Sequence, residues 1–389
     1  MNILFVLRTM DLGGLEVVTS VLANKFVSEG HNVHIFAFAK GKGTAIQRFH
    51  GLDLTICDEY KVSKYNTKLL HELLISKQTN IIINQWGLPF IPIKTINKAC
   101  KGLKTKVITV YHNDPLFNGR IQENELAIQG TKNILKKASY QFKKFLYKRI
   151  TSFSMAYNYH HSDCYLVLSP SYINHFEQFT GIKKHTKLLT QTNPVTIDSE
   201  GYYFDLSKKQ NEVLYVGRLD YVQKRVHRVI DTWANIEKKF PNWKLTIVGD
   251  GEDYKNIKSQ VDNYKLNNVN FVGFQSPNIY YKRAKILILT SEYEGFPLVL
   301  AECMSFGVVP IVYGSFSSVY DIIENRKNGY ILPCNKGFSA EAMSEYFKTI
   351  MNSDTLYKSM AEAAIKTSNK FSVNEIYKSW INIFNHLKI

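Results

Sequence analysis

Two cationic side chains follow a short apolar run near the middle of the sequence. Val213–Val216 is predicted to be a buried strand, Arg218 lies just beyond it, and Lys224 lies at the start of the next predicted helix. Both cations should therefore lie at the carboxyl end of a strand, beside a helix N-terminus that carries roughly half a positive charge. Backbone N–H groups and two cations at one place favour a phosphate-binding site, although a solvated pair of surface charges has the same pattern.

Two glutamates follow a second apolar run, Lys285–Leu289. Pro297 suits a first helical turn, which places Glu294 in the loop before a helix and Glu302 about five residues inside it. The rest of this helix is apolar, so the Glu302 carboxylate needs polar partners, and the two hydroxyls of a ribose would supply them. The alternative is a helix-start carboxylate and an unrelated, salt-bridged glutamate.

The elements that must position these residues alternate along the whole chain. Short apolar runs followed by helical patterns predict two doubly wound α/β domains, one beginning with the strand Asn2–Leu7 and one with Val213–Val216. A polar stretch without apolar periodicity separates them, and such sheets bind ligands at the carboxyl ends of their strands. The expected organisation is an N-terminal Rossmann-like domain (1–195), a linker (196–211), a C-terminal Rossmann-like domain (212–370) and a last helix (371–389).

Three motifs in the C-terminal half together resemble a known family. They are Val216-Gly-Arg218 with Lys224, Val248-Gly249-Asp250-Gly251, and the segment from Glu294 to Glu302 with the Met304-Ser-Phe-Gly307 that follows it. In this order they are similar to the retaining nucleotide-sugar glycosyltransferases of family 4, and the likeness covers essentially all of 212–335. The resemblance implies the GT-B fold, in which two Rossmann-like domains face each other across a cleft.

The resemblance also implies roles for individual residues. Arg218 and Lys224 would bind the donor diphosphate, Glu294 the transferred sugar and Glu302 the nucleoside ribose. The backbone N–H groups near the β-phosphate and the sugar would be those of Gly295, Phe296 and Leu298. One departure is Arg225, where the family often has glycine, and it concerns the geometry of the local turn.

The Asp-rich turn after Val248 has two interpretations. Its carboxylates suggest a metal, but the family that it resembles is metal-independent, and Arg218 with Lys224 would take the role of a divalent ion. We therefore expect no metal and no cofactor, the nucleotide sugar being a co-substrate. Gly249 and Asp250 would instead start a helix near the nucleobase, with Val272 and Phe274 forming another wall.

The N-terminal half offers a weaker set of candidates. Gly13 and Gly14 form a tight turn after the first strand, and in the family's corresponding loop the backbone faces the donor phosphates. His112 follows the predicted strand Lys106–Tyr111, and the family has a histidine here that contacts the donor sugar beside the reacting centre. Asp114 is expected to orient His112, although a lone histidine is often purely structural.

A basic amphipathic segment also lies in this half. Residues 132–149 contain seven basic and no acidic side chains, with apolar residues at helical spacing. Such helices bind anionic membrane surfaces, and the acceptors of GT-B enzymes, often lipid-linked, bind at this domain. The alternative is a helix packed on the N-terminal sheet with a solvated basic face. In GT-B proteins the last helix crosses back to the N-terminal domain, which is the expected role of 371–389.

Composition limits the remaining classes of function. The 389 residues include 49 Lys and Arg against 33 Asp and Glu, so the formal charge of +16 should attract anions, and most of the excess lies in the first 200 residues. Five cysteines without a Cys-x-x-Cys pair argue against a disulfide framework or a zinc ribbon. The short apolar start is not a signal peptide, and no apolar run is long enough to span a bilayer. We expect a cytoplasmic protein that associates peripherally with the inner face of the membrane.

The predicted function is retaining transfer of a hexose from a nucleotide-diphosphate sugar to a saccharide or lipid-linked acceptor, in cell-surface polysaccharide or glycolipid synthesis. A GT-B epimerase or sugar phosphorylase is an alternative, although an epimerase should show a further acid/base set near His112. A nucleic-acid-binding protein is a third possibility, since the net charge is large. No recognition module with interleaved exposed aromatics supports it, so no nucleic-acid partner is expected.

Overall fold

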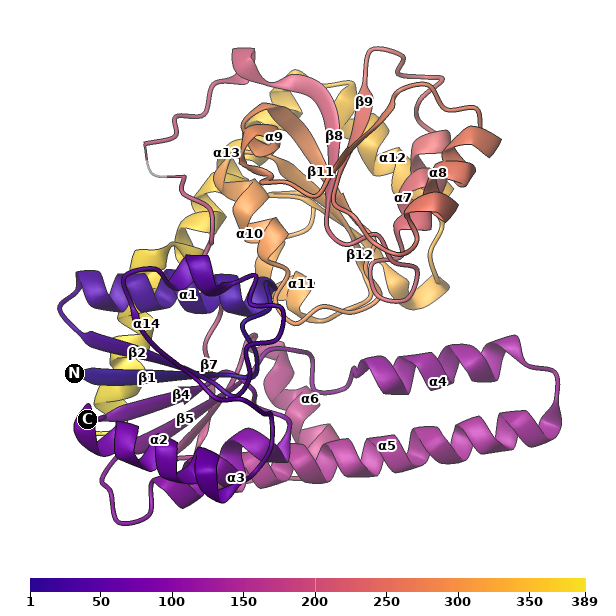
Figure 1. Cartoon of the computed structure of the whole chain (residues 1–389). Helices are drawn as coiled ribbons and strands as arrows, with labels where there is room; N and C mark the ends of the chain where they lie inside the picture. The colour runs from indigo at the N-terminus through magenta and orange to yellow at the C-terminus, as the bar shows by residue number, and fades with distance from the viewer. Residues whose placement is uncertain (200) are drawn as a thin grey trace. The chain divides into compact units, whose positions relative to one another are not determined.

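The computed structural model describes residues 1–199 and 201–389 and divides the chain into two compact units. The first unit is Met1–Thr196 with Val373–Ile389, and the second is Ile197–Ser372. Glu200, in the segment expected to be a linker, lies outside the described residues. Each unit is built on one parallel sheet (Figure 1). The prediction of two doubly wound parallel α/β folds is confirmed.

The sheet of the first unit has seven strands in the order β3-β2-β1-β4-β5-β6-β7. Its central strands are almost wholly apolar because helices cover both faces. Leu4 and Val6 face the side of α2 and α3, while Phe5 packs against Phe26 of α1 on the other side. The strands are β1 (Asn2–Leu7), β2 (Asn32–Ala37), β3 (Asp53–Ile56), β4 (Ile81–Asn84), β5 (Lys106–Tyr111), β6 (Cys164–Val167) and β7 (Leu188–Thr190). The helices that follow them are α1 (Gly14–Ser28), α2 (Lys64–Ser76), α3 (Phe90–Ala99), α4 (Gly119–Gly130), α5 (Ile134–His160) and α6 (Ser171–Thr180).

The sheet of the second unit has six strands in the order β10-β9-β8-β11-β12-β13. Helices α7, α8 and α12 contribute to the hydrophobic core on one face of this sheet. The strands are β8 (Gln210–Val216), β9 (Lys244–Val248), β10 (Val269–Gly273), β11 (Ala284–Leu289), β12 (Val309–Gly314) and β13 (Tyr330–Pro333). The helices are α7 (Val226–Ala234), α8 (Tyr254–Asn263), α9 (Asn278–Arg283), α10 (Leu298–Ser305), α11 (Ser318–Ile322), α12 (Ala340–Met351) and α13 (Asp354–Ser368). Strand β8 thus begins inside the segment expected to be a linker.

In each sheet, successive strands are added first on one side of the first strand and then on its other side. In the first unit this switch point lies between β1 and β4, and in the second it lies between β8 and β11. The loops that leave two neighbouring strands at such a point diverge to opposite faces, which opens a crevice at the carboxyl edge of the sheet. The topology therefore selects the loops after these four strands as the places to look for a ligand site.

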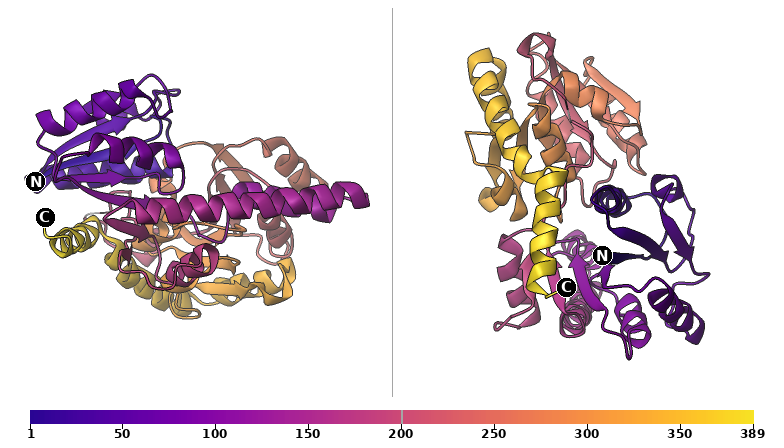
Figure 2. Two further views of the ribbon diagram at one scale, coloured as in Figure 1. Left: turned by 90° about the horizontal axis from the view of Figure 1, so that it is seen from below. Right: turned by 90° about the vertical axis from the view of Figure 1, so that its left-hand side faces the viewer.

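The last helix, α14 (Val373–His386), belongs to the first unit and packs on α1. The ring of Phe26 meets those of Trp380 and Phe384 at centroid distances of 6.4 and 5.7 Å. The Tyr377 hydroxyl also lies 3.1 Å from the Nε2 atom of His31. These contacts attach the C-terminal end of the chain, yellow in Figure 2, to helix α1 of the first unit.

Helices α4 and α5 form a hairpin that projects from the first unit (Figure 1). Only the C-terminal part of α5 packs on the unit, where Ser154 and Asn158 donate hydrogen bonds to the Leu88 carbonyl at 2.5 and 2.8 Å. Between 134 and 150 no described residue of α5 is buried. The alternative prediction, that the basic segment 132–149 packs on the sheet, is therefore wrong. No helix among the described residues is long and apolar enough to cross a membrane.

Candidate functional site

The loops after β8 and β9 touch each other through their backbones, beside the switch point of the second unit. Gly217 and Gly249 both have positive φ angles, 156° and 149°. A Cβ atom on Gly249 would lie 1.9 Å from the Gly217 carbonyl oxygen, and one on Gly251 would lie 2.3 Å from the Leu219 carbonyl oxygen. Side chains are thus excluded here by the neighbouring main chain, which leaves backbone groups at the carboxyl edge of the sheet.

Asp220 holds the two predicted diphosphate cations in place. Its Oδ2 atom accepts a hydrogen bond from Arg218 Nε at 2.7 Å, while Oδ1 accepts from the backbone N–H groups of Gln223 and Lys224 at 2.6 and 3.0 Å. Burial raises the pKa of Asp220, but these N–H groups and the Arg218 guanidinium outweigh it, so the pKa lies below its usual value. The carboxylate is therefore ionised at neutral pH and fixes the turn that carries both cations.

Lys224 and Glu294, predicted separately from two distant motifs, form an ion pair. The Lys224 Nζ atom lies 2.6 Å from Glu294 Oε1, and both side chains are largely buried. The loops that carry them are also joined through Gln223, whose carbonyl accepts from the Glu292 N–H at 2.7 Å. Arg218, by contrast, leaves 62% of its side chain exposed. Both cations are thus paired with a carboxylate, but Lys224 is largely buried whereas Arg218 faces solvent.

Arg225 stands where the resemblance led us to expect a glycine, and its backbone conformation is one that glycine adopts easily. Its backbone is left-handed, with φ 53° and ψ 43°, a conformation that costs a side-chain-bearing residue about 1 kcal/mol. The Arg225 Nε atom lies 3.3 Å from Glu292 Oε2, and Arg228 NH1 lies 3.0 Å from the same oxygen. The turn that precedes α7 is therefore formed despite the missing glycine, with Glu292 as its anionic partner.

Helix α10 positions the second glutamate. It begins at Leu298 with Pro297 just before it, one residue later than the sequence suggested, and Glu302 lies buried one turn inside. The Tyr281 hydroxyl donates a hydrogen bond to Glu302 Oε2 at 3.3 Å. Burial and then the Glu302 charge raise the pKa of Tyr281 well above its usual value, so the hydroxyl stays a donor.

Between the two glutamates, Gly295 and Phe296 are buried, and the Phe296 ring packs on Phe371 at 5.3 Å. This packing fixes the course of the loop that links Glu294 to the start of α10. The backbone groups assigned to the donor phosphate and sugar therefore lie on a rigid segment.

The loops after β9 and β10 lie next to the loop after β8, which carries Arg218 and Lys224. The Gly249 N–H donates to the Gly273 carbonyl at 2.9 Å, and the Leu219 N–H donates to the Asp250 carbonyl at 2.9 Å. Phe274 leaves 78% of its surface exposed, and Val272 is half-buried. Asp253 Oδ2 accepts from the Tyr221 N–H at 2.8 Å, so one carboxylate of the Asp-rich turn holds the neighbouring loop. Among the described residues, no group of three or more His, Cys, Asp or Glu side chains is arranged to hold a metal ion.

In the first unit, the predicted glycine turn starts α1. Gly13 is the N-cap and Gly14 the first helical residue. The buried Glu16 carboxylate folds back toward this turn, where a Cβ atom on Gly13 would lie 2.9 Å from Glu16 Oε2. Burial raises the pKa of Glu16 to about 7, although hydrogen bonds from the backbone of Glu16 and Gly13 lower it. Part of the helix N-terminus is therefore satisfied by its own glutamate.

His112 follows β5 and pairs with a residue that the sequence reasoning missed. Its Nε2 atom lies 2.6 Å from Gln85 Oε1, at the end of β4. Because an amide oxygen only accepts, Nε2 carries the hydrogen and Nδ1 keeps its lone pair. The predicted partner, Asp114, instead accepts a hydrogen bond from His175 Nδ1 at 2.7 Å. Burial lowers the pKa of His112 to about 4, so the imidazole is neutral at neutral pH.

We expect Gln85→Glu to raise the pKa of His112 by about one to three units, because a carboxylate would replace the neutral amide beside Nε2. An NMR titration of the His112 ring measures this shift. Gln85→Asn, which keeps a neutral partner, is the matched control and should leave the pKa near its low value. An unchanged His112 titration in Gln85→Glu would show that Gln85 does not set the state of the ring.

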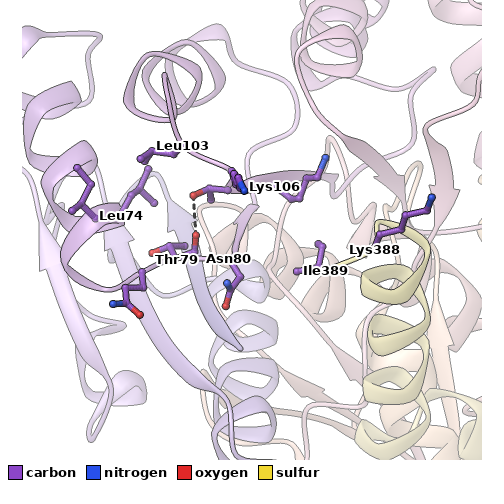
Figure 3. A pocket seen from close by; sticks show the side chains of 11 residues that line it. Leu74, Thr79, Asn80, Leu103, Lys106, Lys388 and Ile389 are labelled. Atoms are coloured by element: carbon purple, nitrogen blue, oxygen red, sulfur yellow. Dashed lines mark hydrogen bonds between the residues drawn. The ribbon is translucent and has the colours of Figure 1, made fainter.

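A cavity of about 350 Å³ in the first unit does not coincide with any predicted site residue. Figure 3 shows Thr79, Asn80 and Lys106 around it, together with Lys388 and Ile389 from the C-terminal end of the chain. Asn80 precedes β4 and Lys106 begins β5, so the cavity lies at the amino edge of the sheet. His112 lies at the opposite, carboxyl edge, where parallel sheets bind their ligands.

Comparison with known proteins gives matches over both units. Residues 12–195 match the family model described as Glycosyltransferase Family 4, and residues 204–367 match the one described as Glycosyl transferases group 1. The amylovoran biosynthesis glycosyltransferase AmsD of Erwinia amylovora is 33% identical over 46% of this chain and 49% of its own length. An α-1,4-N-acetyl-D-galactosaminyltransferase of Campylobacter jejuni, named for a diNAcBac-PP-undecaprenol-linked substrate, is 25% identical over 100% of this chain and 99% of its own.

Solved structures of the same kind cover nearly the whole chain. The lipopolysaccharide outer core galactosyltransferase WaaB in its apo form superimposes with a TM-score of 0.71 at 21% identity, covering 99% of this chain and 100% of WaaB. Anabaena HepE in complex with UDP superimposes with a TM-score of 0.76 at 16% identity, with the same coverage. These likenesses confirm the predicted GT-B fold.

Proposed function

Because the chain belongs to glycosyltransferase family 4, we propose that it is a retaining hexosyltransferase that uses a nucleotide-diphosphate sugar. The acceptor is a hydroxyl of a saccharide or lipid-linked glycan, in the synthesis of a cell-surface polysaccharide or glycolipid. The observation that carries this proposal is the Lys224–Glu294 ion pair, 2.6 Å long, beside the exposed Arg218 at the switch point of the second sheet.

The chemistry follows from where charge develops. As the bond between the sugar C1 and the leaving oxygen breaks, the diphosphate gains negative charge, and the acceptor hydroxyl approaches from the same face of the sugar. Arg218 and Lys224 would meet that charge, held by Asp220 before the donor arrives, so little reorganisation is needed. Lys224 would then bridge the diphosphate and Glu294, which in turn accepts hydrogen bonds from the transferred sugar. No protein nucleophile is required.

The remaining contacts would fix the nucleoside. Glu302, oriented by the Tyr281 hydroxyl, would accept hydrogen bonds from the ribose. The exposed ring of Phe274 and the side chain of Val272 would cover the base, next to the backbone of Gly249 and Asp250. The structure of Anabaena HepE was solved with UDP, which makes a uridine nucleotide the first donor to test.

The first unit would contribute to both substrates, through His112 at the donor sugar and as the domain that binds the acceptor. The neutral His112 imidazole, held by Gln85, would offer its Nδ1 lone pair to a hydroxyl of the donor sugar beside the reacting centre. The relatives support a membrane-linked or cell-envelope product: one is named for an undecaprenol-linked substrate and others for the transfer of galactose to lipopolysaccharide. We therefore also propose that the protein acts at the inner face of the cell membrane.

A screen of nucleotide sugars tests the proposal. We expect one or a few donors to raise the melting temperature of the protein, and an undecaprenol-linked or saccharide acceptor to yield a product with the anomeric configuration of the donor, as read by NMR. The same screen with Lys224→Ala should show little or no turnover. The proposal fails if no nucleotide sugar binds, or if the product is inverted.

Transfer should also persist when divalent metals are removed. Arg218 and Lys224 would supply the positive charge that a metal supplies to other diphosphate leaving groups, so we expect the rate in excess EDTA to stay within about twofold of the untreated rate. Restoring Mg²⁺ or Mn²⁺ should add nothing further. A loss of activity in EDTA that Mg²⁺ reverses would contradict the metal-independent mechanism while leaving donor binding untouched.

A further inference from the structure

Helix α5 presents an apolar face that the described parts of the chain leave largely uncovered, with the Phe153 ring meeting the Phe90 ring at a centroid distance of 5.9 Å. Phe142, Phe145 and Phe153 leave 63%, 59% and 67% of their surfaces exposed. Ile134, Leu135 and Leu146 are exposed as well. At about 3.6 residues per turn these positions gather on one side of the helix. An apolar stripe of this length on a water-facing helix marks an interaction surface.

The partner helix α4 covers the other side of α5. Arg120 places its guanidinium 5.8 Å from the centre of the Tyr147 ring, and Lys144 forms an ion pair with Glu125. Tyr140, Lys144 and Tyr147 are the half-buried positions of α5 between 134 and 150. The polar contacts between α4 and α5 therefore lie on the side of α5 opposite its apolar face. A helix pair usually buries its apolar residues between the two helices, and this hairpin does not.

The positive charge beside this face indicates which kind of partner it binds. Residues 132–149 contain seven basic side chains and no acidic ones. Lys136 and Lys143 border one side of the apolar face, and Lys137 and Lys148 border the other. Arg149 lies on the face itself, between Phe145 and Phe153, where its long side chain can extend to the lipid phosphates. A second copy of the chain would bring the same positive charges against one another, whereas an anionic bilayer offers phosphates at its surface and acyl chains beneath them.

We propose that the apolar face of α5, formed by Ile134, Leu135, Phe142, Phe145, Leu146 and Phe153, lies in the headgroup region of an anionic phospholipid bilayer. The flanking lysines contact lipid phosphates, and α4 keeps the hairpin rigid from the far side. Because the apolar face runs from Ile134 to Phe153, the contact is an extended line along the membrane plane. Figure 2, left, shows α5 along its whole length, as the long magenta helix. This inference adds to the proposed function a surface that would bring the first unit to a lipid-linked acceptor.

The test is co-sedimentation of the full chain with vesicles of phosphatidylcholine and phosphatidylglycerol, compared with phosphatidylcholine alone. Wild-type protein should bind the anionic vesicles, and Phe142→Ser/Phe145→Ser/Leu146→Ser should bind them at least about tenfold more weakly. Tyr65→Ser/Ile75→Ser, which removes exposed apolar side chains of α2 in the same unit, is the matched control and should bind like wild type. Far-UV circular dichroism and nucleotide affinity establish that each variant is folded.

A second set of variants tests the charges. Lys136→Gln/Lys143→Gln/Lys148→Gln should weaken binding to anionic vesicles by on the order of 10²-fold and reduce its salt dependence. Lys98→Gln/Lys101→Gln/Lys104→Gln, with the same change in net charge in the same unit, should have a much smaller effect.

Three results would overturn the inference. They are no binding of wild-type protein to the anionic vesicles, binding of the serine variant at the wild-type level, and a dimer in light scattering that the serine substitutions dissociate. Transfer to a water-soluble saccharide acceptor is measured in parallel. Absence of transfer by wild-type protein would contradict the proposed function. Weak vesicle binding by wild-type protein that still catalyses transfer would contradict the membrane contact alone.

Discussion

Replacing Lys224 with alanine should lower kcat by on the order of 10²–10³-fold, the usual loss when a fixed group that stabilises developing negative charge is removed. The Lys224 ammonium is held between the Glu294 carboxylate and a turn anchored by Asp220, so no other side chain can move into its place without breaking these contacts. Single-turnover kinetics with a confirmed donor separates the chemical step from product release. The substitution should affect the transition state more than donor affinity, because charge on the diphosphate grows as the sugar leaves.

Two control variants make this result specific. Lys255→Ala removes an exposed lysine of α8 in the same unit and should retain wild-type turnover. Lys224→Ala/Glu294→Gln replaces the largely buried Glu294 carboxylate, which has lost its ammonium partner, by a neutral amide. Its melting temperature should exceed that of Lys224→Ala. If activity returned together with stability in the double variant, the loss in Lys224→Ala would reflect folding and the assigned role would be wrong.

The parts of the fold that the sequence predicts are those built from continuous apolar runs. Central strands such as β1 and β11 are buried on both faces, so their hydrophobicity appears in any short window. The edge strand β3 was not predicted, because Asp53–Ile56 is only half-buried and mixes polar with apolar residues. Strand β7, three residues long, is too short to give a pattern. An edge strand forms because it pairs with a neighbouring strand, and the local sequence pattern contains no information about that pairing.

The same distinction applies to the site. Arg218, Lys224 and Glu294 could be predicted because each follows a strand at a recognisable motif, and the structure brings Lys224 and Glu294 into contact. Their supporting residues could not. Asp220 has one signal, its position two residues after Arg218, but its hydrogen bonds to the backbone of the turn depend on the loop conformation.

Partners from other elements were missed altogether. Gln85 and Tyr281 bond to His112 and Glu302 from separate elements, 27 and 21 residues away in the chain. Asp114 was assigned to His112 because it is near in sequence, yet it bonds to His175 on α6, 61 residues away. Hydrogen-bond partners of this kind are set by how strands and helices stack, and sequence spacing alone carries no information about them.

The basic helix shows a further limit of periodicity. Apolar spacing between 132 and 149 predicted an amphipathic helix, and α5 is one. The pattern alone cannot say whether the apolar side meets a sheet or another partner. In the structure only the later part of α5 packs on the first unit, where Ser154 and Asn158 donate hydrogen bonds to the Leu88 carbonyl. The basic part of α5 extends beyond this contact.

Replacing Glu302 with alanine should weaken nucleotide binding by about tenfold to 10²-fold, since hydrogen bonds to a charged acceptor contribute about 1.5–3 kcal/mol each. Calorimetry with the nucleoside diphosphate of the confirmed donor measures this change, and kcat at saturating donor should fall much less. Tyr281→Phe is the matched control: it removes the hydroxyl that donates to Glu302 Oε2 at 3.3 Å but keeps the carboxylate, so its effect should be smaller.

A nucleotide that lacks the ribose hydroxyls completes a double-mutant cycle with Glu302→Ala. If Glu302 binds the ribose, wild-type protein should prefer the ribonucleotide over its 2′,3′-dideoxy analogue, and the variant should bind both about equally, because the carboxylate and the hydroxyls act as one interaction. An unchanged preference in Glu302→Ala would show that another group binds the ribose. Glu302 would then be a buried carboxylate whose role is to hold Tyr281 and α10 together.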